Sequence, residues 1–139
     1  MINWDRVKFF IPGEFQDPNH PGSGELIDGV TLLWLVELRI DTGWPIKVHW
    51  EVGGAVDMDG SHGHAKDSFH LAKNGCMAVD FHFITKASLR KQFYAVMNSK
   101  FSGIGIYPEW DNPGFHVDPR HFDLTQIWKK VGRKYIYFF

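Results

Sequence analysis

Histidine dominates the chemically reactive side chains of this chain. The sequence contains eight histidines and one cysteine, and six of the histidines lie between His62 and His121. Because cysteine is nearly absent, a metal site would have to be built from histidine and carboxylate groups. The single cysteine, Cys76, excludes an intrachain disulfide. No basic residue stands directly beside it, and we interpret it as a small packed side chain rather than a nucleophile.

Three residues have the types and surroundings of zinc ligands. His70 lies at the end of a long loop, and Asp80 and His116 each lie between two apolar residues of a predicted strand. A carboxylate between apolar neighbours is costly unless it is paired, faces a cleft or binds a metal. Catalytic zinc usually takes three protein ligands and leaves one position open. The sequence therefore predicts a zinc site at His70, Asp80 and His116.

Alternating apolar and polar residues predict the strands that position these ligands. We expect strands at 45–52, 77–83, 103–107 and 115–118, and two more in the tail, with a turn near Val131–Gly132. In strands 77–83 and 115–118 the apolar residues alternate with Asp80 and His116. The two ligands then face a common cleft if the strands are neighbours. The glycine-containing segment 53–76 is expected to be a long functional loop.

Two helices are expected between the strands. Asp28 is a plausible N-cap for the first, which Gly43 and Pro45 would end, and Ser88 can cap a second helix that runs to about Lys100. Residues 1–25 are expected to form an irregular arm anchored by aromatic residues such as Phe9, Phe10 and Phe15. The whole chain, residues 1–139, is expected to be one α+β domain with a small antiparallel sheet and helices packed on one face.

Composition excludes several classes of function. The formal net charge is −1, which argues against wide contact with a phosphate backbone, so no nucleic-acid partner is expected. The apolar stretch from Val30 to Val36 is far shorter than the ~20 residues of a membrane span, so no membrane insertion is expected. The N-terminus lacks the pattern of a secretory signal. We expect cytoplasmic synthesis, followed by release to the cell wall or association with a virion.

The candidate ligands lie in a run that resembles a known family. Ser68, His70, Gly75, Ala78 and Asp80 follow the order of the motif of the M15 family of zinc peptidases. These are D-Ala-D-Ala carboxypeptidases and peptidoglycan endopeptidases that share a fold with the Hedgehog signalling domain. The run from Gly103 to Arg120 is similar to the second half of that pattern in phage and prophage members.

This resemblance implies a Hedgehog/DD-peptidase-like fold, with zinc ligands at His70, Asp80 and His116. Three features depart from the family pattern. The spacer between His70 and Asp80 is longer, the segment 52–60 has no arginine to polarise a scissile carbonyl, and Pro113 and Gly114 stand where many members place a catalytic carboxylate.

A general base is needed to take a proton from water and pass it to the leaving amine. We consider Glu109, Asp111 and Asp118, in that order, although the simplest role of Asp118 is to pair with Arg120 or to support a ligand. The resemblance also suggests that His64 stabilises an oxyanion, and a loop histidine without a role is an equal alternative.

The remaining histidines and aromatic residues have simpler interpretations. His62, His82 and His121 could form a second site, but His82 shares a strand face with Asp80 and can simply line the cleft. Tyr107 and Trp110 could stack on a sugar or cap the pocket, and core packing is the more common role of such residues.

Two functions from different classes remain open. The first is a monomeric zinc metallopeptidase that hydrolyses peptidoglycan peptides, either as a D-alanyl-D-alanine carboxypeptidase or as an endopeptidase. The second is a non-catalytic wall-binding or virion structural module on the same fold, which the missing arginine and the unclear base favour. A nuclease is disfavoured by the charge.

Overall fold

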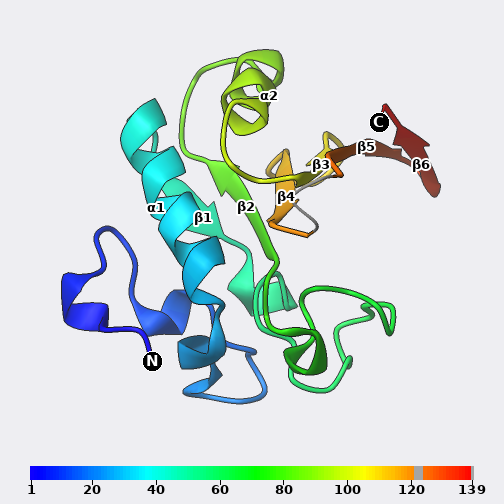
Figure 1. The fold of residues 1–139 in the computed structure, drawn as a ribbon. Helices are drawn as coiled ribbons and strands as arrows, with labels where there is room; N and C mark the ends of the chain where they lie inside the picture. Colours follow the sequence, from blue (N-terminus) through cyan, green and yellow to red (C-terminus); the bar gives the residue numbers. More distant parts are fainter. Residues whose placement is uncertain (121–123, 139) are drawn as a thin grey trace.

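The protein consists of a six-stranded sheet and two helices (Figure 1), which confirms the α+β class. The computed structural model describes residues 1–120 and 124–138. The helices are α1 (Gly29–Thr42) and α2 (Leu89–Met97). The strands are β1 (Ile46–Val48), β2 (Val79–Phe83), β3 (Gly103–Tyr107), β4 (Gly114–Asp118), β5 (Gln126–Val131) and β6 (Lys134–Tyr137). No helix among the described residues is long and apolar enough to cross a membrane.

The strand order is β1-β2-β4-β3-β5-β6, and all neighbouring strands are antiparallel except β3 and β5. The prediction of an antiparallel sheet is therefore wrong for the pair β3 and β5, and the sheet is mixed. The chain reverses direction between β4 and β5, and β3 already occupies the place beside β4. Strand β5 consequently pairs on the far side of β3 and runs parallel to it.

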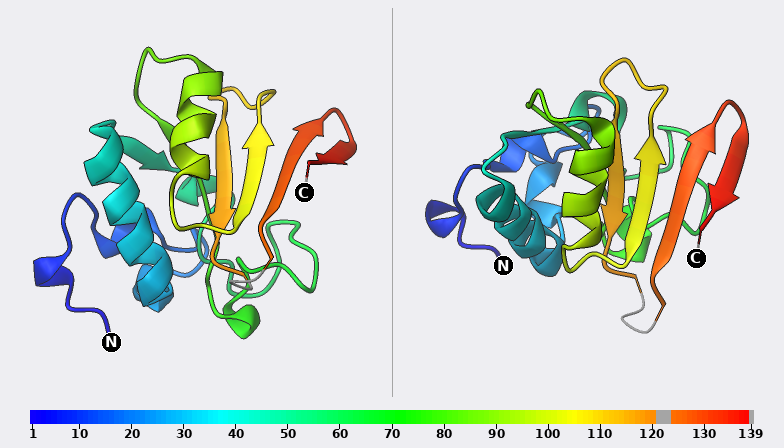
Figure 2. Two further views of the ribbon diagram at one scale, coloured as in Figure 1. Left: turned by 45° about the horizontal axis from the view of Figure 1, so that its top comes forward. Right: turned by 90° about the horizontal axis from the view of Figure 1, so that it is seen from above.

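The apolar face of the sheet forms the core together with the helices. Figure 2 shows both helices on the same side of the sheet, as predicted. Leu32, Leu35 and Leu38 of α1 and Val96 of α2 are buried in one cluster with alternate residues of the central strands. Those strand residues are Val79, Phe81, Phe83, Ile104, Ile106, Phe115 and Val117. The other residues of these strands face away from the helices, so their polar side chains lie on the face of the sheet that α1 and α2 do not cover.

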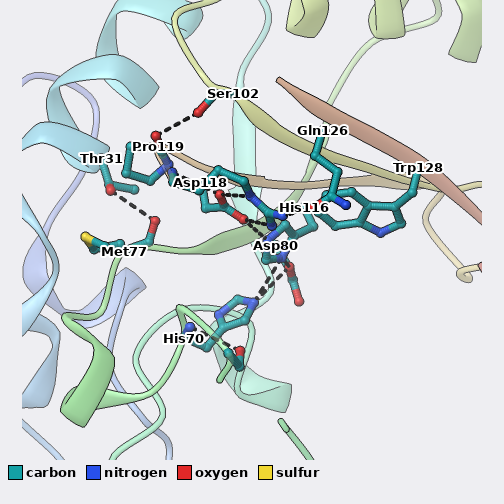
Figure 3. Close-up of polar contacts among 12 residues, drawn as sticks. Thr31, His70, Met77, Asp80, Ser102, His116, Asp118, Pro119, Gln126 and Trp128 are labelled. Carbon is teal, nitrogen blue, oxygen red and sulfur yellow. Dashed lines mark hydrogen bonds and ion pairs between the residues drawn. The ribbon is translucent and has the colours of Figure 1, made fainter. Parts of the chain in front are cut away.

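Both helix starts agree with the sequence. Asp28 accepts a hydrogen bond from the backbone N–H of Thr31, and Ser88 accepts one from that of Lys91. The buried hydroxyl of Thr31 also donates to the carbonyl of Met77, which ties the first turn of α1 to the segment before β2 (Figure 3).

Strand β1 is shorter than the predicted strand 45–52. Ile46 and Val48 are buried as expected, but the chain leaves the sheet at His49 and forms a 3-10 turn over Trp50–Val52. Two glycines then fold the chain back. Gly53 has a left-handed φ of 78°, and the N–H of Gly54 donates to the carbonyl of His49. Because of this turn Val52 is 73% exposed rather than buried.

The N-terminal arm contains three short 3-10 segments: Trp4–Arg6, Pro12–Glu14 and Ser23–Leu26. Phe10 and Phe15 are buried anchors, as predicted, and their rings pack edge to face. The prediction for Phe9 is wrong. Its φ of 71° turns the ring outward, where it lies under the guanidinium of Arg39.

Candidate metal centre

His70, Asp80 and His116 meet on the polar face of the sheet (Figure 3). Oδ1 of Asp80 lies 2.8 Å from Nδ1 of His116 and 3.1 Å from Nε2 of His70, and these two nitrogens are 3.2 Å apart. Two imidazole nitrogens and one carboxylate oxygen therefore point at a common centre. The three predicted ligands are brought together, and His70 and Asp80 also belong, with His64, to a group of donor atoms close enough to hold a metal ion.

Strand register places two of these ligands side by side. Asp80 of β2 is directly opposite His116 of β4, and the flanking pairs are Val79 with Val117 and Phe81 with Phe115. These flanking side chains are fully buried in the core. Burial of the apolar pairs thus fixes the register, because a slip of one residue would turn the apolar residues out and the ligands in.

A folded loop supplies the third ligand. The backbone of Asp57 pairs with that of His70 and Ala72, so the long loop returns beside its own start. Nδ1 of His70 lies 2.9 Å from the carbonyl oxygen of Ala55. A carbonyl only accepts, so Nδ1 carries the proton and Nε2 presents a lone pair to the centre.

His116 is oriented in the same way by a carboxylate. Its Nε2 donates to Oδ2 of Asp118 at 2.8 Å, which leaves Nδ1 for the centre. Asp118 is completely buried, and Arg120 donates to both of its oxygens, at 2.7 and 2.6 Å. The expected pair of Asp118 with Arg120 is present, and it fixes the carboxylate that orients the ligand.

The electrostatics of the cluster favour a cation. Burial alone would raise the pKa of the Asp80 carboxyl, but His70 and His116 beside it hold that pKa well below its usual range. Burial would lower the pKa of His116, yet hydrogen bonds to Asp118 and Asp80 raise it to about 9. In the metal-free protein a proton on His116 thus occupies the place that a metal ion would take.

Glycines of β3 make room for the residues around the cluster. A Cβ on Gly105, the residue opposite His116, would lie 2.7 Å from the indole of Trp128. A Cβ on Gly103 would collide with Asp118 and Arg120. The glycines at alternate positions of this strand therefore let Trp128 and the Asp118–Arg120 pair lie flat across the sheet.

His64 lies against the cluster. Its ring stacks on that of His70 with centroids 4.2 Å apart, and one of its ring nitrogens is within 4.8 Å of the ligand atoms of His70 and Asp80. Nδ1 of His64 is 2.7 Å from Oδ2 of the fully buried Asp57. Burial and the neighbouring His70 lower the pKa of His64, although Asp57 opposes them. Sequence analysis missed Asp57, because nothing local marks its pairing with His64.

A second group of titratable side chains holds the loop from behind. Asp17, Asp57 and His62 lie close enough to share an ion. However, Asp17 already accepts from the backbone N–H groups of Asn19 and Met58 and contacts His62 at 2.9 Å. These contacts account for the buried carboxylate of Asp17, so we assign the group a structural role in tying the loop to the N-terminal arm.

The other candidate residues lie at different distances from the cluster. Glu109 accepts a hydrogen bond from the backbone N–H of Gly132 at the β5–β6 turn. It is not among the described residues that line the two cavities beside the cluster. Asp111 lines one of them. Of the second-site histidines, His62 contacts Asp17, His82 contacts His49 at 2.7 Å, and His121 lies outside the described residues.

Tyr107 and Trp110 stack on each other, with ring centroids 4.3 Å apart, and both line a cavity beside the cluster. Burial raises the pKa of Tyr107 to about 12, so its hydroxyl keeps its proton at neutral pH. That hydroxyl accepts from the indole N–H of Trp128 at 3.3 Å and can itself donate. These two residues form cleft walls rather than core.

Burial also raises the pKa of Cys76, to about 11, in keeping with a packed thiol. Comparison with family models, curated proteins and solved structures finds no match to this chain.

Proposed function

We propose that the protein is a zinc-dependent peptidase that hydrolyses peptide bonds of peptidoglycan. The observation that carries the proposal is the convergence of Nε2 of His70, Nδ1 of His116 and Oδ1 of Asp80 within 3.2 Å of one another. Two histidines and one carboxylate are a common ligand set of catalytic zinc. A bound zinc ion there would acidify water and polarise a substrate carbonyl.

His64 is the best-placed group for proton transfer. Because its Nδ1 donates to Asp57, its Nε2 presents a lone pair and can accept a proton. The buried Asp57 orients the ring and stabilises it once it is charged. With a lone pair on Nε2, His64 fits the role of a general base that later donates the proton to the leaving amine. It does not fit the role of an oxyanion donor, which the family resemblance suggests. The proton of Tyr107 is then available to the substrate carbonyl.

Peptidoglycan is proposed as substrate because of the sequence resemblance, and the open cleft with aromatic walls is compatible with it. The alternative is a wall-binding module that keeps the metal but has no catalysis. The specific observation in its favour is that Glu109, the first choice for a carboxylate base, is engaged at the β5–β6 turn.

The test compares the wild-type protein with His64→Gln and His116→Ala in zinc content and in hydrolysis of purified muropeptides. We expect the wild-type protein to bind one zinc ion and release peptide fragments. His64→Gln should keep the zinc and lose about 10²-fold or more in rate, as is typical for the loss of a general base, and His116→Ala should lose both. Zinc binding without any product from the wild-type protein would favour the binding module.

A further inference from the structure

A groove runs across the polar face of the sheet, and the candidate metal centre lies near its middle rather than at a closed end. Two cavities, of about 600 and 480 Å³, flank the cluster. Both are lined by His64, Asp80 and Trp110, so they meet at the centre. One, which we call the histidine half, extends toward β1, and the other, the aromatic half, extends toward β5 and β6.

Among the described residues that line the histidine half, each lysine is already engaged by another side chain. Lys47 is paired with Glu51 at 2.5 Å, and Nζ of Lys130 lies over the ring of Tyr135, 5.3 Å from its centroid. Nε2 of His49 and Nδ1 of His82 are 2.7 Å apart, so one ring donates to the other.

Among its described lining residues, the aromatic half likewise has no arginine or lysine without a partner. Its guanidinium, that of Arg120, donates to both oxygens of Asp118 and lies over the ring of Trp128. The other charged side chain at its rim, Asp67, would repel a carboxylate. The walls are flat aromatic rings, among them Tyr107, Trp128 and Tyr135.

A carboxypeptidase must bind the charged end of its substrate one residue beyond the reacting carbonyl, and an unshared cation is the strongest partner for that group. From the two open halves, whose cations are engaged by carboxylates or by an aromatic ring, we propose that this protein is an endopeptidase whose substrate is a peptide that continues on both sides of the cleaved bond. This inference rests on the proposed function and specifies the bond that is attacked.

The experiment uses the zinc-loaded full chain and three synthetic stem peptides: one with a free D-Ala-D-Ala carboxylate, the same peptide with a C-terminal amide, and one extended by several residues. We expect kcat/KM for the amide and the extended peptide to be at least equal to that of the free acid. A loss of about 10²-fold or more on amidation, the discrimination of a site built for the carboxylate, would overturn the proposal.

Variants test the two halves separately. His82→Ala in the histidine half and Tyr135→Ala in the aromatic half should each raise KM for the extended peptide. Tyr94→Ala is the matched control, because Tyr94 is as exposed as Tyr135 (48% against 50%) but lies on α2, on the opposite side of the sheet. An effect from only one half would contradict a substrate that occupies both.

If no peptide is cleaved, the proposed function fails. A binding experiment then still tests whether a peptide occupies both halves of the groove. The extended peptide should then shift the NMR signals of both the His82 ring and the Trp128 indole N–H. Shifts on one side only, or none, would overturn the two-sided groove.

Discussion

Nε2 of His116 donates to Oδ2 of Asp118, two residues further along β4, at 2.8 Å. Both side chains are on the same face of the strand, so a local spacing of two residues orients the ring. Arg120, two residues further again, donates to Asp118 from its guanidinium and from its backbone N–H. Asp118 and Arg120, at alternate positions after His116, thus support this ligand of the candidate metal centre.

Asp118→Asn should weaken zinc binding without removing a ligand. The amide can accept from only one oxygen and cannot stabilise charge on His116, and changes at such supporting residues typically cost about 10–100-fold in metal affinity. Competition with a chelator measures the change. Asp67→Asn, an exposed change at the rim of the same cavity, should keep wild-type affinity. Equal affinity in both variants would contradict the supporting role of Asp118.

Zinc should raise the melting temperature of the wild-type protein and of His82→Ala, but not that of His116→Ala. A ligand that binds only the folded state stabilises it in proportion to its occupancy. His82 is the matched control because it lies on β2 on the same face as Asp80, two residues away. Thermal unfolding with and without zinc tests this prediction, and a zinc-dependent shift that survives in His116→Ala would contradict the ligand assignment.

Acid should destabilise the protein partly through Asp17. Burial alone would raise the pKa of this carboxyl, but hydrogen bonds from Met58, His62 and Asn19 lower it to about 2. A carboxylate whose pKa is lower in the folded state stabilises the fold when the pH is above its unfolded-state pKa of ~3.9. This stabilisation is lost as the pH falls toward ~2. Chemical denaturation at a series of pH values between about 5 and about 2 measures this loss.

Asp17→Asn should show a flatter dependence of unfolding free energy on pH across that window than the wild-type protein. The exposed Asp67→Asn serves again as the control and should retain the wild-type slope. Identical slopes for Asp17→Asn and the wild-type protein would contradict the lowered pKa.

Gly105→Ala should destabilise the fold through Trp128. The added Cβ would lie 2.7 Å from the indole of Trp128 and equally close to the ring of Tyr107, so these rings must shift, and overpacking of this kind costs about 1–3 kcal/mol. Gly13→Ala has open space around its Cβ and should change stability by less than about 0.5 kcal/mol. Urea unfolding of both variants decides the point, and equal stabilities would contradict the close packing of Trp128 over β3.

The sequence was most informative where a pattern is local. Alternation along 77–83 and 115–118 predicted that Asp80 and His116 share a face, and the caps at Asp28 and Ser88 predicted two helix starts. The pairing of β5 with β3 was not predictable in this way, because it depends on which edge is still available when the chain returns.

The same distinction applies to the candidate site. Asp57 and Asp17 reach their histidines through a folded loop, over separations of 7 and 45 residues, and both are ordinary aspartates in the sequence. His49 contacts His82 because the turn after β1 redirects the chain. Such contacts are set by tertiary packing and have no periodic signal.

The central claim is that His70, Asp80 and His116 bind one zinc ion. It is tested most directly by an anomalous difference map, recorded at the zinc edge from crystals of the zinc-loaded protein. We predict one peak about 2.0–2.2 Å from Nε2 of His70, Nδ1 of His116 and Oδ1 of Asp80. A peak at Asp17, Asp57 and His62 instead, or no peak at the predicted ligands, would contradict the account.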